Sequence, residues 1–324
     1  MIKKERTIPL VIPKCEALLR RLPDQHPKRP QIEEQLAKSL KGYNGEKSID
    51  YFLSELLSNK YYIFYGLRLP KNKTNYAQID VLILTKFYIL IIEVKNISGE
   101  IKIDTELNQM IRKINDKIEV YNDPFLQLER HKKTISTMLQ SQNYLSLPIE
   151  TLLLISDPST YIEFTKPSKE LIRKTVRSTN LVSKIESIDE KYRLERLSIK
   201  DMNKLSRSFI KKHTPLNPDV LSMFQIDKNE IQKGVHCPKC SFLPIHKKKN
   251  RNKWYCPKCN GEYQDAHLAT LRDYALLISQ SITNQECRDF LQITSSDGAY
   301  RILQSLNLEQ AGEKKTRRYH FEIQ

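Results

Sequence analysis

Two short apolar runs separated by a polar break constrain the fold of this chain more than any other feature. Val81–Leu84 forms the first run and Phe87–Ile92 the second, with two polar residues between them. Apolar runs of this length around a tight break predict a β-hairpin built from buried strands. Asp80 precedes the first run and Glu93 follows the second. The hairpin is therefore expected to bring two carboxylates to one edge of a buried sheet.

The charged residues at this edge have the composition of a metal site. Glu93 and Lys95 are two residues apart in a strand, so their side chains point to the same face. Buried carboxylates are costly unless they bind a cation, and oxygen ligands suit Mg²⁺ or Mn²⁺. We expect Asp80, Glu93 and the carbonyl of Val94 to hold the metal, with Glu46 as a further ligand or outer-shell contact. An exposed hairpin carrying these residues by chance is the alternative.

This pattern is what metal-assisted hydrolysis of phosphodiester bonds requires. The metal ions would bind the phosphate and activate a water molecule. Lys95 would stand beside the attacking water or would counter the charge that develops on the phosphate.

The order of the predicted elements gives an α/β fold, with a mixed sheet flanked by helices. A glycine break at 42–45 is expected to precede a helix that has Glu46 in its first turn and an apolar face from Ile49 to Leu57. We predict helices over 31–40, 122–140, 180–188 and 198–212, and strands over 61–69, 101–103, 110–114, 117–120 and 149–155.

Net charge points to a polyanionic partner. The chain has 54 Lys and Arg against 38 Asp and Glu, a formal net charge of +16. Nucleic acid is favoured over an anionic membrane surface because no basic amphipathic helix stands out, although a generically basic protein is the alternative. The longest apolar runs have four to six residues, whereas a membrane span needs about 18. With no secretory signal visible, we expect a cytoplasmic protein.

Four separated motifs then resemble a known family, the nuclease-related (NERD) domain, which is a branch of the PD-(D/E)XK nuclease superfamily. The motifs are Gly45-Glu46, Gln78-Ile79-Asp80, Glu93-Val94-Lys95-Asn96 followed by Gly99, and Asp123-Pro124-x-x-Gln127. They span about residues 40–155 in the order typical of the family. The resemblance implies a restriction-endonuclease-like core with Glu46, Asp80, Glu93 and Lys95 as the active site and Gln127 close to it.

Two residues of the following helix have alternative roles. Gln127 would orient Lys95 or a phosphate oxygen, or would simply make a hydrogen bond at the start of the helix. His131 lies one turn later on the same face and is more often structural in such a position.

No motif residue departs from the family pattern, so we expect an active DNA nuclease. A non-catalytic DNA-binding or regulatory scaffold, or an RNA-directed nuclease, is the alternative, and a homodimer is possible.

Four cysteines indicate a zinc ribbon over residues 236–265. Cys237 and Cys240 are separated by fifteen residues from the second pair, Cys256 and Cys259. Two CxxC turns complete a tetrahedral Cys₄ site for a structural Zn²⁺. A redox pair is the alternative, but it would use a single CxxC at a helix start. The nearby histidines, His236 and His246, are expected to be spectators.

Between the cysteine pairs runs a basic and aromatic segment. Cations suit phosphates and aromatic rings suit bases, so this segment is typical of nucleic-acid binding. The alternative is a solvated hairpin tip with Trp254 packed in the small core. The candidate contacts are Lys247, Lys248, Lys249, Arg251 and Lys253.

Residues 266–324 resemble a winged helix-turn-helix. A helix is predicted over 267–280, a capping box at Thr283–Glu286 opens a second, and Ser295 or Ser296 caps a third. A basic β-wing follows Gly312. A helical cap used for protein contacts is the alternative. The expected nucleic-acid contacts are Arg301, Gln304, Lys314, Lys315, Arg317 and Arg318.

The sequence therefore predicts five segments. They are an N-terminal lead segment (1–41), a nuclease domain (42–212), a proline-containing linker (213–235), a zinc ribbon (236–265) and a winged helix-turn-helix-like domain (266–324).

Overall fold

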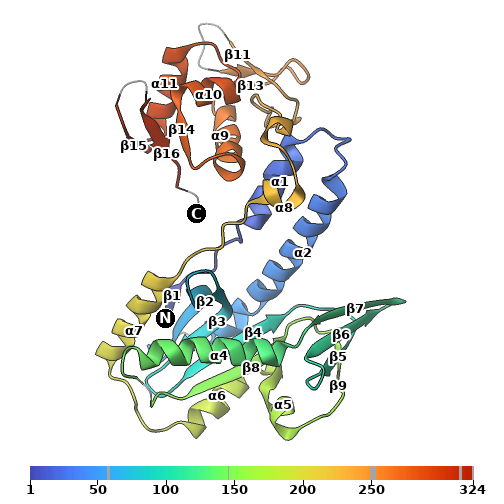
Figure 1. Cartoon of the computed structure of the whole chain (residues 1–324), viewed down its shortest axis with the longest axis vertical. Coiled ribbons are helices and arrows are strands. Elements are labelled where there is room, and N and C mark those ends of the chain that lie inside the picture. The colour runs from blue at the N-terminus through green and yellow to red at the C-terminus, as the bar shows by residue number, and fades with distance from the viewer. Residues whose placement is uncertain (57–58, 145, 249–252, 314–315, 323–324) are drawn as a thin grey trace. The chain divides into compact units, whose positions relative to one another are not determined.

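The computed structural model describes residues 1–56, 59–144, 146–248, 253–313 and 316–322 (Figure 1). The chain divides into two compact units. Unit 1 contains Met1–Ile8 and Leu40–Leu216, and unit 2 contains Pro9–Ser39 and Asn217–Gln324. The predicted mixed α/β architecture is confirmed.

A six-stranded mixed sheet forms the centre of unit 1. The predicted hairpin is present as β3 (Tyr76–Leu84) and β4 (Ile89–Lys95), which pair antiparallel with Val81 opposite Ile92. β4 also pairs in parallel with β8 (Ile149–Ile155), and this mixture requires a crossover between the two strands. The strand order is β1 (Ile2–Lys4), β2 (Tyr62–Pro70), β3, β4, β8 and β10 (Thr175–Arg177).

Both faces of this sheet are covered, which explains why its strands read as continuous apolar runs. On one face, Phe64, Ile91 and Leu153 belong to the same core as apolar residues of the helices α4 (Pro124–Gln140) and α7 (Ile199–Lys212). The alternate residues belong to the other core, which includes residues of α3 (Asp50–Ser54) and α6 (Leu181–Lys191). Each fully buried Leu, Ile or Phe contributes about 1.5–3 kcal/mol to stability.

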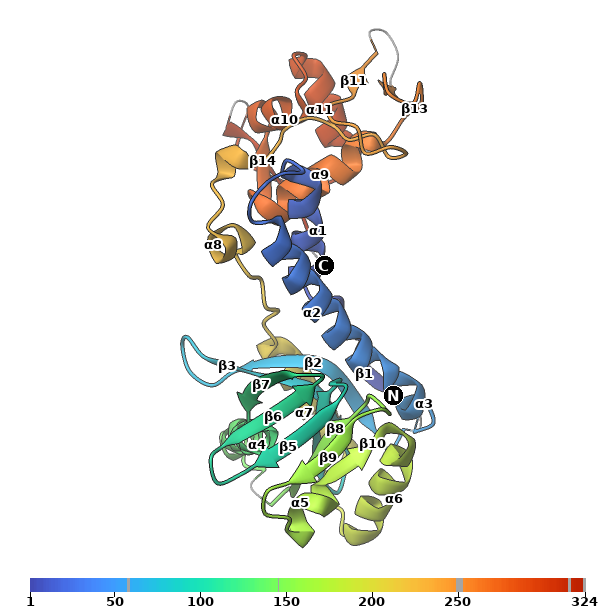
Figure 2. The same ribbon diagram turned by 90° about the vertical axis from the view of Figure 1, so that its right-hand side faces the viewer.

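A second, four-stranded sheet lies beside the central one in unit 1. Its strands are β7 (Lys117–Asn122), β6 (Gln109–Ile114), β5 (Glu100–Asp104) and β9 (Tyr161–Phe164), in that order (Figure 2). Buried Ile101, Ile103 and Met110 attach it to the core under α4. The short helix α5 (Lys169–Lys174) and the 3₁₀ turn η1 (Ser178–Asn180) connect β9 and β10 to α6.

The predicted break at Gly42–Gly45 is wrong. Helix α2 (Arg29–Ser48) continues through both glycines, so Glu46 lies in its last turn and not in the first turn of a new helix. A Cβ at Gly45 would lie 2.1 Å from the Cβ of Asn96. Gly45 is therefore required by close packing within a helix, although glycine costs a helix about 1 kcal/mol relative to alanine.

The first residues of the chain take part in unit 1. β1 pairs in parallel with β2, and the Nζ of Lys4 donates a hydrogen bond to the carbonyl of Tyr65 at 2.7 Å. This pairing carries Arg6 to the end of α2. The N-terminal segment therefore supplies both a strand and a side chain to the region that contains Glu46.

Unit 2 has a single core to which residues from all its parts contribute. The segment 217–235, within the predicted linker, forms α8 (Val220–Phe224) and the 3₁₀ turn η2 (Lys228–Glu230), and buries Val220 and Leu221. The other elements are α1 (Val11–Arg21), β11 (His246–Lys247), β12 (Trp254–Tyr255), β13 (Glu262–Tyr263), α9 (Ala266–Leu277), β14 (Ser281–Thr283), α10 (Asn284–Leu291), α11 (Ser296–Ser305), β15 (Glu309–Ala311) and β16 (Arg318–His320).

A buried ion pair joins α1 to α9 within unit 2. The Nε of Arg21 lies 2.9 Å from the Oδ2 of Asp273, and both side chains are almost completely buried. Arg21 also donates to the carbonyl of Gly234 at 2.7 Å. These bonds fix the start of the cysteine-containing segment against α1.

Among the helices of the described residues, none combines the length and the apolar character needed to cross a lipid bilayer.

Candidate active site and metal centre

Asp80 lies in β3 beside the end of β4, as the hairpin predicts. Its carboxylate is buried, and Oδ2 accepts a hydrogen bond from the backbone N–H of Val94 at 2.8 Å. The register of the hairpin places Asp80 next to Glu93 on the neighbouring strand. One carboxylate oxygen of Asp80 is thereby fixed by the backbone of the segment that carries the second carboxylate.

Glu93 and Lys95 point to the face of the sheet that α4 covers. The Nζ of Lys95 lies 2.7 Å from the Oε1 of Glu93 and donates a second hydrogen bond to the Oε1 of Gln127 at 3.2 Å. Gln127 comes from the first turns of α4, whose N-terminus is capped by the side chain of Asp123. The structure thus brings Lys95 and Gln127 together, although 31 residues separate them in sequence.

One oxygen of this cluster is left without a hydrogen bond. The Oε2 of Glu93 is buried and has no hydrogen-bond partner among the described residues. The Nδ1 of His131 lies 3.8 Å away and is also buried without a hydrogen bond. Burial, together with the charges of Lys71 and Lys95, lowers the pKa of His131 to about 4, so the ring is neutral near neutral pH.

Glu46 approaches the cluster from the end of α2 but is held by an arginine. Its Oε2 lies 2.7 Å from the Nη1 of Arg6, and Arg6 also contacts Asp50 at 2.8 Å. The Arg6 side chain is 6% exposed and that of Glu46 is 25% exposed. Glu46 is therefore partly open to solvent and partly neutralised.

The carboxylates of the cluster resist ionisation. Burial, reinforced by the charge of Asp80, raises the pKa of Glu93 to about 8 and that of Glu46 to about 8. Burial also raises the pKa of Asp80, although the Val94 N–H and Lys95 oppose the shift. Burial alone would lower the pKa of Lys95, but Glu93 outweighs it and the pKa rises. A bound cation would therefore lower the pKa values of these carboxyl groups and stabilise their ionised form.

The donor set fits a divalent cation of the Mg²⁺ type. The carboxylates of Asp80 and Glu93 are hard oxygen ligands, and the unpartnered Oε2 of Glu93 is costly to bury without a cation or donor. Within the described residues, only the cysteines form a group of three or more ligands close enough to hold a metal ion. Glu46, Asp80 and Glu93 do not meet that spacing.

Sequence reasoning did not find Arg6 and Asp50, which surround Glu46. Arg6 lies 40 residues before Glu46 in a segment without a recognisable motif. No periodicity or spacing in the sequence connects the two. Only the pairing of β1 with β2 brings them together.

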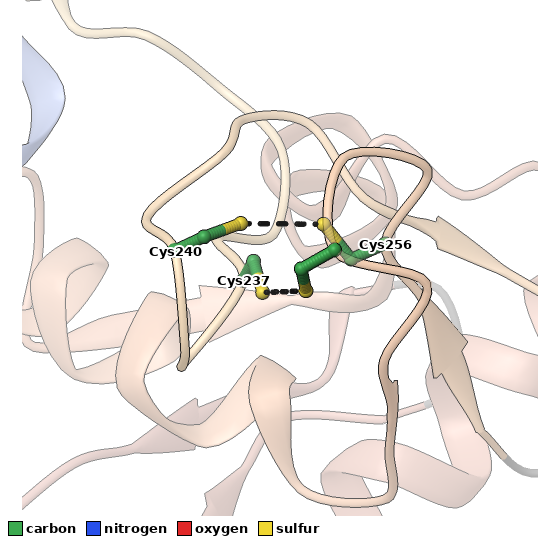
Figure 3. Close-up of side chains that lie close together, drawn as sticks. Cys237, Cys240 and Cys256 are labelled. Carbon is green, nitrogen blue, oxygen red and sulfur yellow. Dashed lines mark hydrogen bonds between the residues drawn. The ribbon is translucent and has the colours of Figure 1, made fainter.

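The four cysteines converge in unit 2 as predicted (Figure 3). Their sulfur atoms all lie within 4.8 Å of one another. The Sγ atoms of Cys237 and Cys259 are 3.5 Å apart, as are those of Cys240 and Cys256. A tetrahedral zinc with Zn–S bonds of about 2.3 Å needs S–S edges of about 3.8 Å. The cluster is compatible with a zinc ribbon, and all four cysteines are free of disulfides.

Neither neighbouring histidine belongs to this cluster. The Nε2 of His236 lies 2.9 Å from the carbonyl of Arg20, and burial is the main cause that lowers its pKa to about 4. His246 lies in β11, where it pairs with Tyr255 of β12. The expectation that both are spectators agrees with the ligand group, which contains the four cysteines alone.

The basic segment between the cysteine pairs is described in part. Trp254 is 1% exposed and donates from Nε1 to the Nδ1 of His267 at 3.2 Å, so it lies in the core of unit 2. Lys248 forms an ion pair with Glu262 and lies 4.8 Å from the centre of the Tyr255 ring. Lys253 lies 3.5 Å from the same carboxylate, and Lys247 is half-buried; Lys249 and Arg251 lie outside the described residues.

The C-terminal elements follow the order helix, strand, helix, helix, strand, strand. They include a sheet in the order β14–β16–β15, and the predicted capping box at Thr283 and Glu286 is present. Arg301 is exposed on α11. Burial is the main cause that lowers the pKa of Lys247, and the charge of Arg301 adds to this effect.

The other predicted contacts of this module differ in their surroundings. Gln304 donates to the hydroxyl of Tyr319 at 3.2 Å. Arg318 contacts Ser281 and Glu286, whereas Arg317 is half-buried. Lys314 and Lys315 lie outside the described residues.

Searches for similar curated proteins and for similar solved structures found no match. The segment that carries Glu46, Asp80, Glu93 and Lys95 does match a known family. Residues 41–156 match the sequence model of the nuclease-related domain (NERD), which confirms the resemblance seen in the motifs.

Proposed function

We propose that this protein is a metal-dependent nuclease that hydrolyses phosphodiester bonds of DNA. The observation that supports this function best is the buried group formed by Asp80, Glu93 and Lys95 inside the segment that matches the nuclease-related domain. Buried charges without a role are costly, and perturbed carboxylates gathered at one sheet edge are typical of catalytic sites.

Asp80 and Glu93 would hold the metal, with the carbonyl of Val94 as a third ligand. Mg²⁺ or Mn²⁺ supplies a Lewis acid for the phosphate and lowers the pKa of a bound water. The Val94 N–H orients Asp80, and the Oε2 of Glu93 is already free of hydrogen bonds. Glu46 would act as a further ligand or an outer-shell contact once it is free of Arg6.

Lys95 would stabilise the negative charge that develops on the phosphate. Its raised pKa keeps the ammonium protonated, so it donates hydrogen bonds and does not act as a base. The side chain is already anchored by Glu93 and by Gln127. Gln127 therefore positions the lysine from α4.

Unit 2 would deliver the site to DNA. The cysteine cluster would bind a structural Zn²⁺, because four protein thiolates leave no open coordination position. The element order of residues 266–320 supports a winged helix. Arg301 is exposed on α11 and is a candidate for base or phosphate contact. Lys247 and Arg317, which are half-buried, are further candidates.

One observation favours a second candidate, a non-catalytic DNA-binding scaffold. The ion pair between Arg6 and Glu46 occupies a carboxylate that an active site would use, and the three carboxylates are not gathered as closely as the cysteines. In this second candidate function, the protein binds DNA but does not cleave it.

A cleavage assay separates the two candidates. Supercoiled plasmid is incubated with the full chain in Mg²⁺, Mn²⁺ or EDTA, alongside the variants Asp80→Ala and Lys95→Ala. Asp116→Ala is the matched control, since this exposed acid lies in the turn between β6 and β7. An RNA substrate of the same length is tested in parallel.

The proposal expects nicking or linear product with Mg²⁺ or Mn²⁺ for the wild type and the control, and none with EDTA. Both active-site variants should lose cleavage while keeping DNA binding. Persistent cleavage in Asp80→Ala and Lys95→Ala would overturn the site. Binding without cleavage would support the scaffold, and cleavage of RNA alone would overturn the DNA assignment.

A further inference from the structure

Helix α7 has one apolar face that is firmly packed. Met202, Leu205 and Phe209 are buried in the core under α4. The ring of Phe209 meets that of Phe64 in β2 edge to face, with centroids 5.7 Å apart. The packing fixes the rotation of the helix, so the opposite face is committed to solvent.

The opposite face carries a row of four cations. Lys200, Lys204, Arg207 and Lys211 are all exposed and follow the spacing i, i+4, i+7 and i+11. At about 100° per residue, these positions fall within an arc of about 60° on the side opposite the buried face. At 1.5 Å per residue the row extends for about 16 Å. We call these four residues the α7 stripe.

The stripe has one acidic neighbour, Asp201, but forms no ion pair within the described part of the chain. Hydrogen bonds from Ser198 and Tyr144 are the main causes that lower the pKa of Asp201, and the charge of Lys204 adds to them. No ion pair links any of its four cations to a carboxylate, whereas Lys38 on α2 and Lys174 on α5 pair with acids one turn away. The only acid of α7, Asp201, is bound by Ser198 and by the hydroxyl of Tyr144. Like charges one turn apart destabilise a helix, so an unpaired row is a cost without a partner.

The stripe leads toward the edge of the sheet that carries the candidate site. At the C-terminal end of α7, the Nδ1 of His213 accepts a hydrogen bond from the N–H of Arg68 at 3.1 Å. Arg68 pairs with Gln78, two residues before Asp80. Lys71, in the turn after β2, is close enough to His131 to lower its pKa. Positive charge therefore continues from α7 to the site within unit 1.

We infer that the α7 stripe binds the phosphate backbone of duplex DNA beside the candidate active site. A duplex is a rigid polyanion with a charge about every 1.7 Å of its axis, and a straight row of fixed cations is complementary to it. A lipid surface is a poorer partner, because Met202, Leu205 and Phe209 are buried against the sheet and cannot insert. Only Ile199 and Ile210 remain as exposed apolar side chains on α7. This inference rests on the proposed nuclease function, since it supplies the DNA that the site would cut.

The test measures binding separately from cleavage. Fluorescence anisotropy of a labelled DNA duplex is followed in EDTA over a series of salt concentrations, with the full chain. The variant Lys204→Gln/Arg207→Gln removes two cations of the stripe, and Lys204→Arg/Arg207→Lys keeps them. Lys113→Gln/Lys117→Gln is the matched control, since both lysines are exposed on the four-stranded sheet and neither forms an ion pair among the described residues.

Each lost phosphate contact should reduce the slope of log K against log salt by about 0.9, so the double glutamine variant should lose about 1.8. The charge-conserving variant and the control should bind as the wild type does. Unchanged affinity and slope in the glutamine variant would overturn the inference. An equal loss in the control would also overturn it, because bulk charge would then be the cause. Circular dichroism confirms that each variant is folded.

The same proteins are then assayed for plasmid cleavage in Mg²⁺. If the wild type cleaves and the α7 variant binds and cleaves equally well, the inferred role of the stripe is wrong but the proposed nuclease function is supported. If the wild type does not cleave but the α7 variant loses binding, the inferred role of the stripe is supported and the proposed nuclease function is wrong. A loss seen with an RNA duplex and not with DNA would overturn the choice of DNA.

Discussion

Arg6 and Glu46 form an ion pair in which the Nη1 of the arginine lies 2.7 Å from the Oε2 of the glutamate. The same guanidinium contacts Asp50, so one arginine neutralises two carboxylates at the end of α2. Because the arginine is 6% exposed, it is a structural member of unit 1 as well as a neighbour of the candidate site.

The variant Arg6→Gln should lower the free energy of unfolding by about 1–3 kcal/mol. The variant leaves two carboxylates close together without their counter-ion, and hydrogen bonds to charged groups contribute on this scale. Denaturant unfolding measures the change, with Arg130→Gln, an exposed arginine on α4, as the control. A double-mutant cycle with Glu46→Gln should give a coupling of about 0.5–3 kcal/mol. Zero coupling would show that the contact does not contribute.

Two glycines of the same helix should respond in opposite ways to alanine. Gly42→Ala should stabilise the protein by up to about 1 kcal/mol, since nothing lies within 4 Å of the new Cβ and alanine favours helix. Gly45→Ala should destabilise it, because the Cβ would lie 2.1 Å from that of Asn96. Thermal unfolding of both variants tests the pair. Equal stabilisation would mean that α2 and Asn96 do not meet as described.

Zinc should be present at about one ion per chain and should be required by unit 2. Cys240→Ser and Cys259→Ser should lose the metal, and strong chelators should lower the melting temperature of the wild type. Elemental analysis measures the metal. Cys287→Ser is the control, since this free thiol is buried outside the cluster and its substitution should leave the metal in place. A metal-free wild type would refute the site.

Metal-free protein should lose stability as the pH rises through about 8. Burial raises the pKa of Glu93 from an ordinary value of 4.5 to about 8, so the folded state binds this proton more tightly than the unfolded state. The stability that this proton contributes is fully present below about pH 4.5. It is lost as the pH rises through about 8, the pKa of Glu93 in the folded state. Denaturant unfolding in EDTA at pH 6 and pH 9 compares the wild type with Glu93→Gln.

The wild type should lose more stability over this range than Glu93→Gln does, and Mg²⁺ should restore it at pH 9, because a cation favours the ionised form. Equal losses in both proteins would show that Glu93 ionises normally.

Much of the candidate site could be predicted because its signals are local. The hairpin follows from two apolar runs and a tight break, and it fixes which residues of β3 and β4 are neighbours. The capping box at Thr283 and the CxxC spacing work in the same way, since each depends on a few consecutive residues. The prediction failed at Gly45, where the low helix propensity of glycine indicated a break in the helix. Close packing against the distant Asn96 instead places this glycine inside α2.

The α7 stripe could be predicted only in part from the sequence. Its spacing of four cations is visible in the sequence, yet no basic amphipathic helix was recognised there. Periodicity alone cannot say whether the cations of a helix are paired with acids on neighbouring elements. The structure shows that neither Lys204 nor Arg207 forms an ion pair among the described residues, and all four cations are exposed, so the row forms a basic surface.

The sequence by itself determined the local pieces of this protein: the buried hairpin with its acids, the two cysteine turns and the motifs of the nuclease-related segment. Each depends on spacing along a short stretch of chain. Only the tertiary structure decided which distant residues meet. Arg6 reaches Glu46 because β1 joins the sheet beside β2, and Gln127 reaches Lys95 because α4 packs across β4. Such contacts follow from strand order and helix packing, which no local pattern encodes.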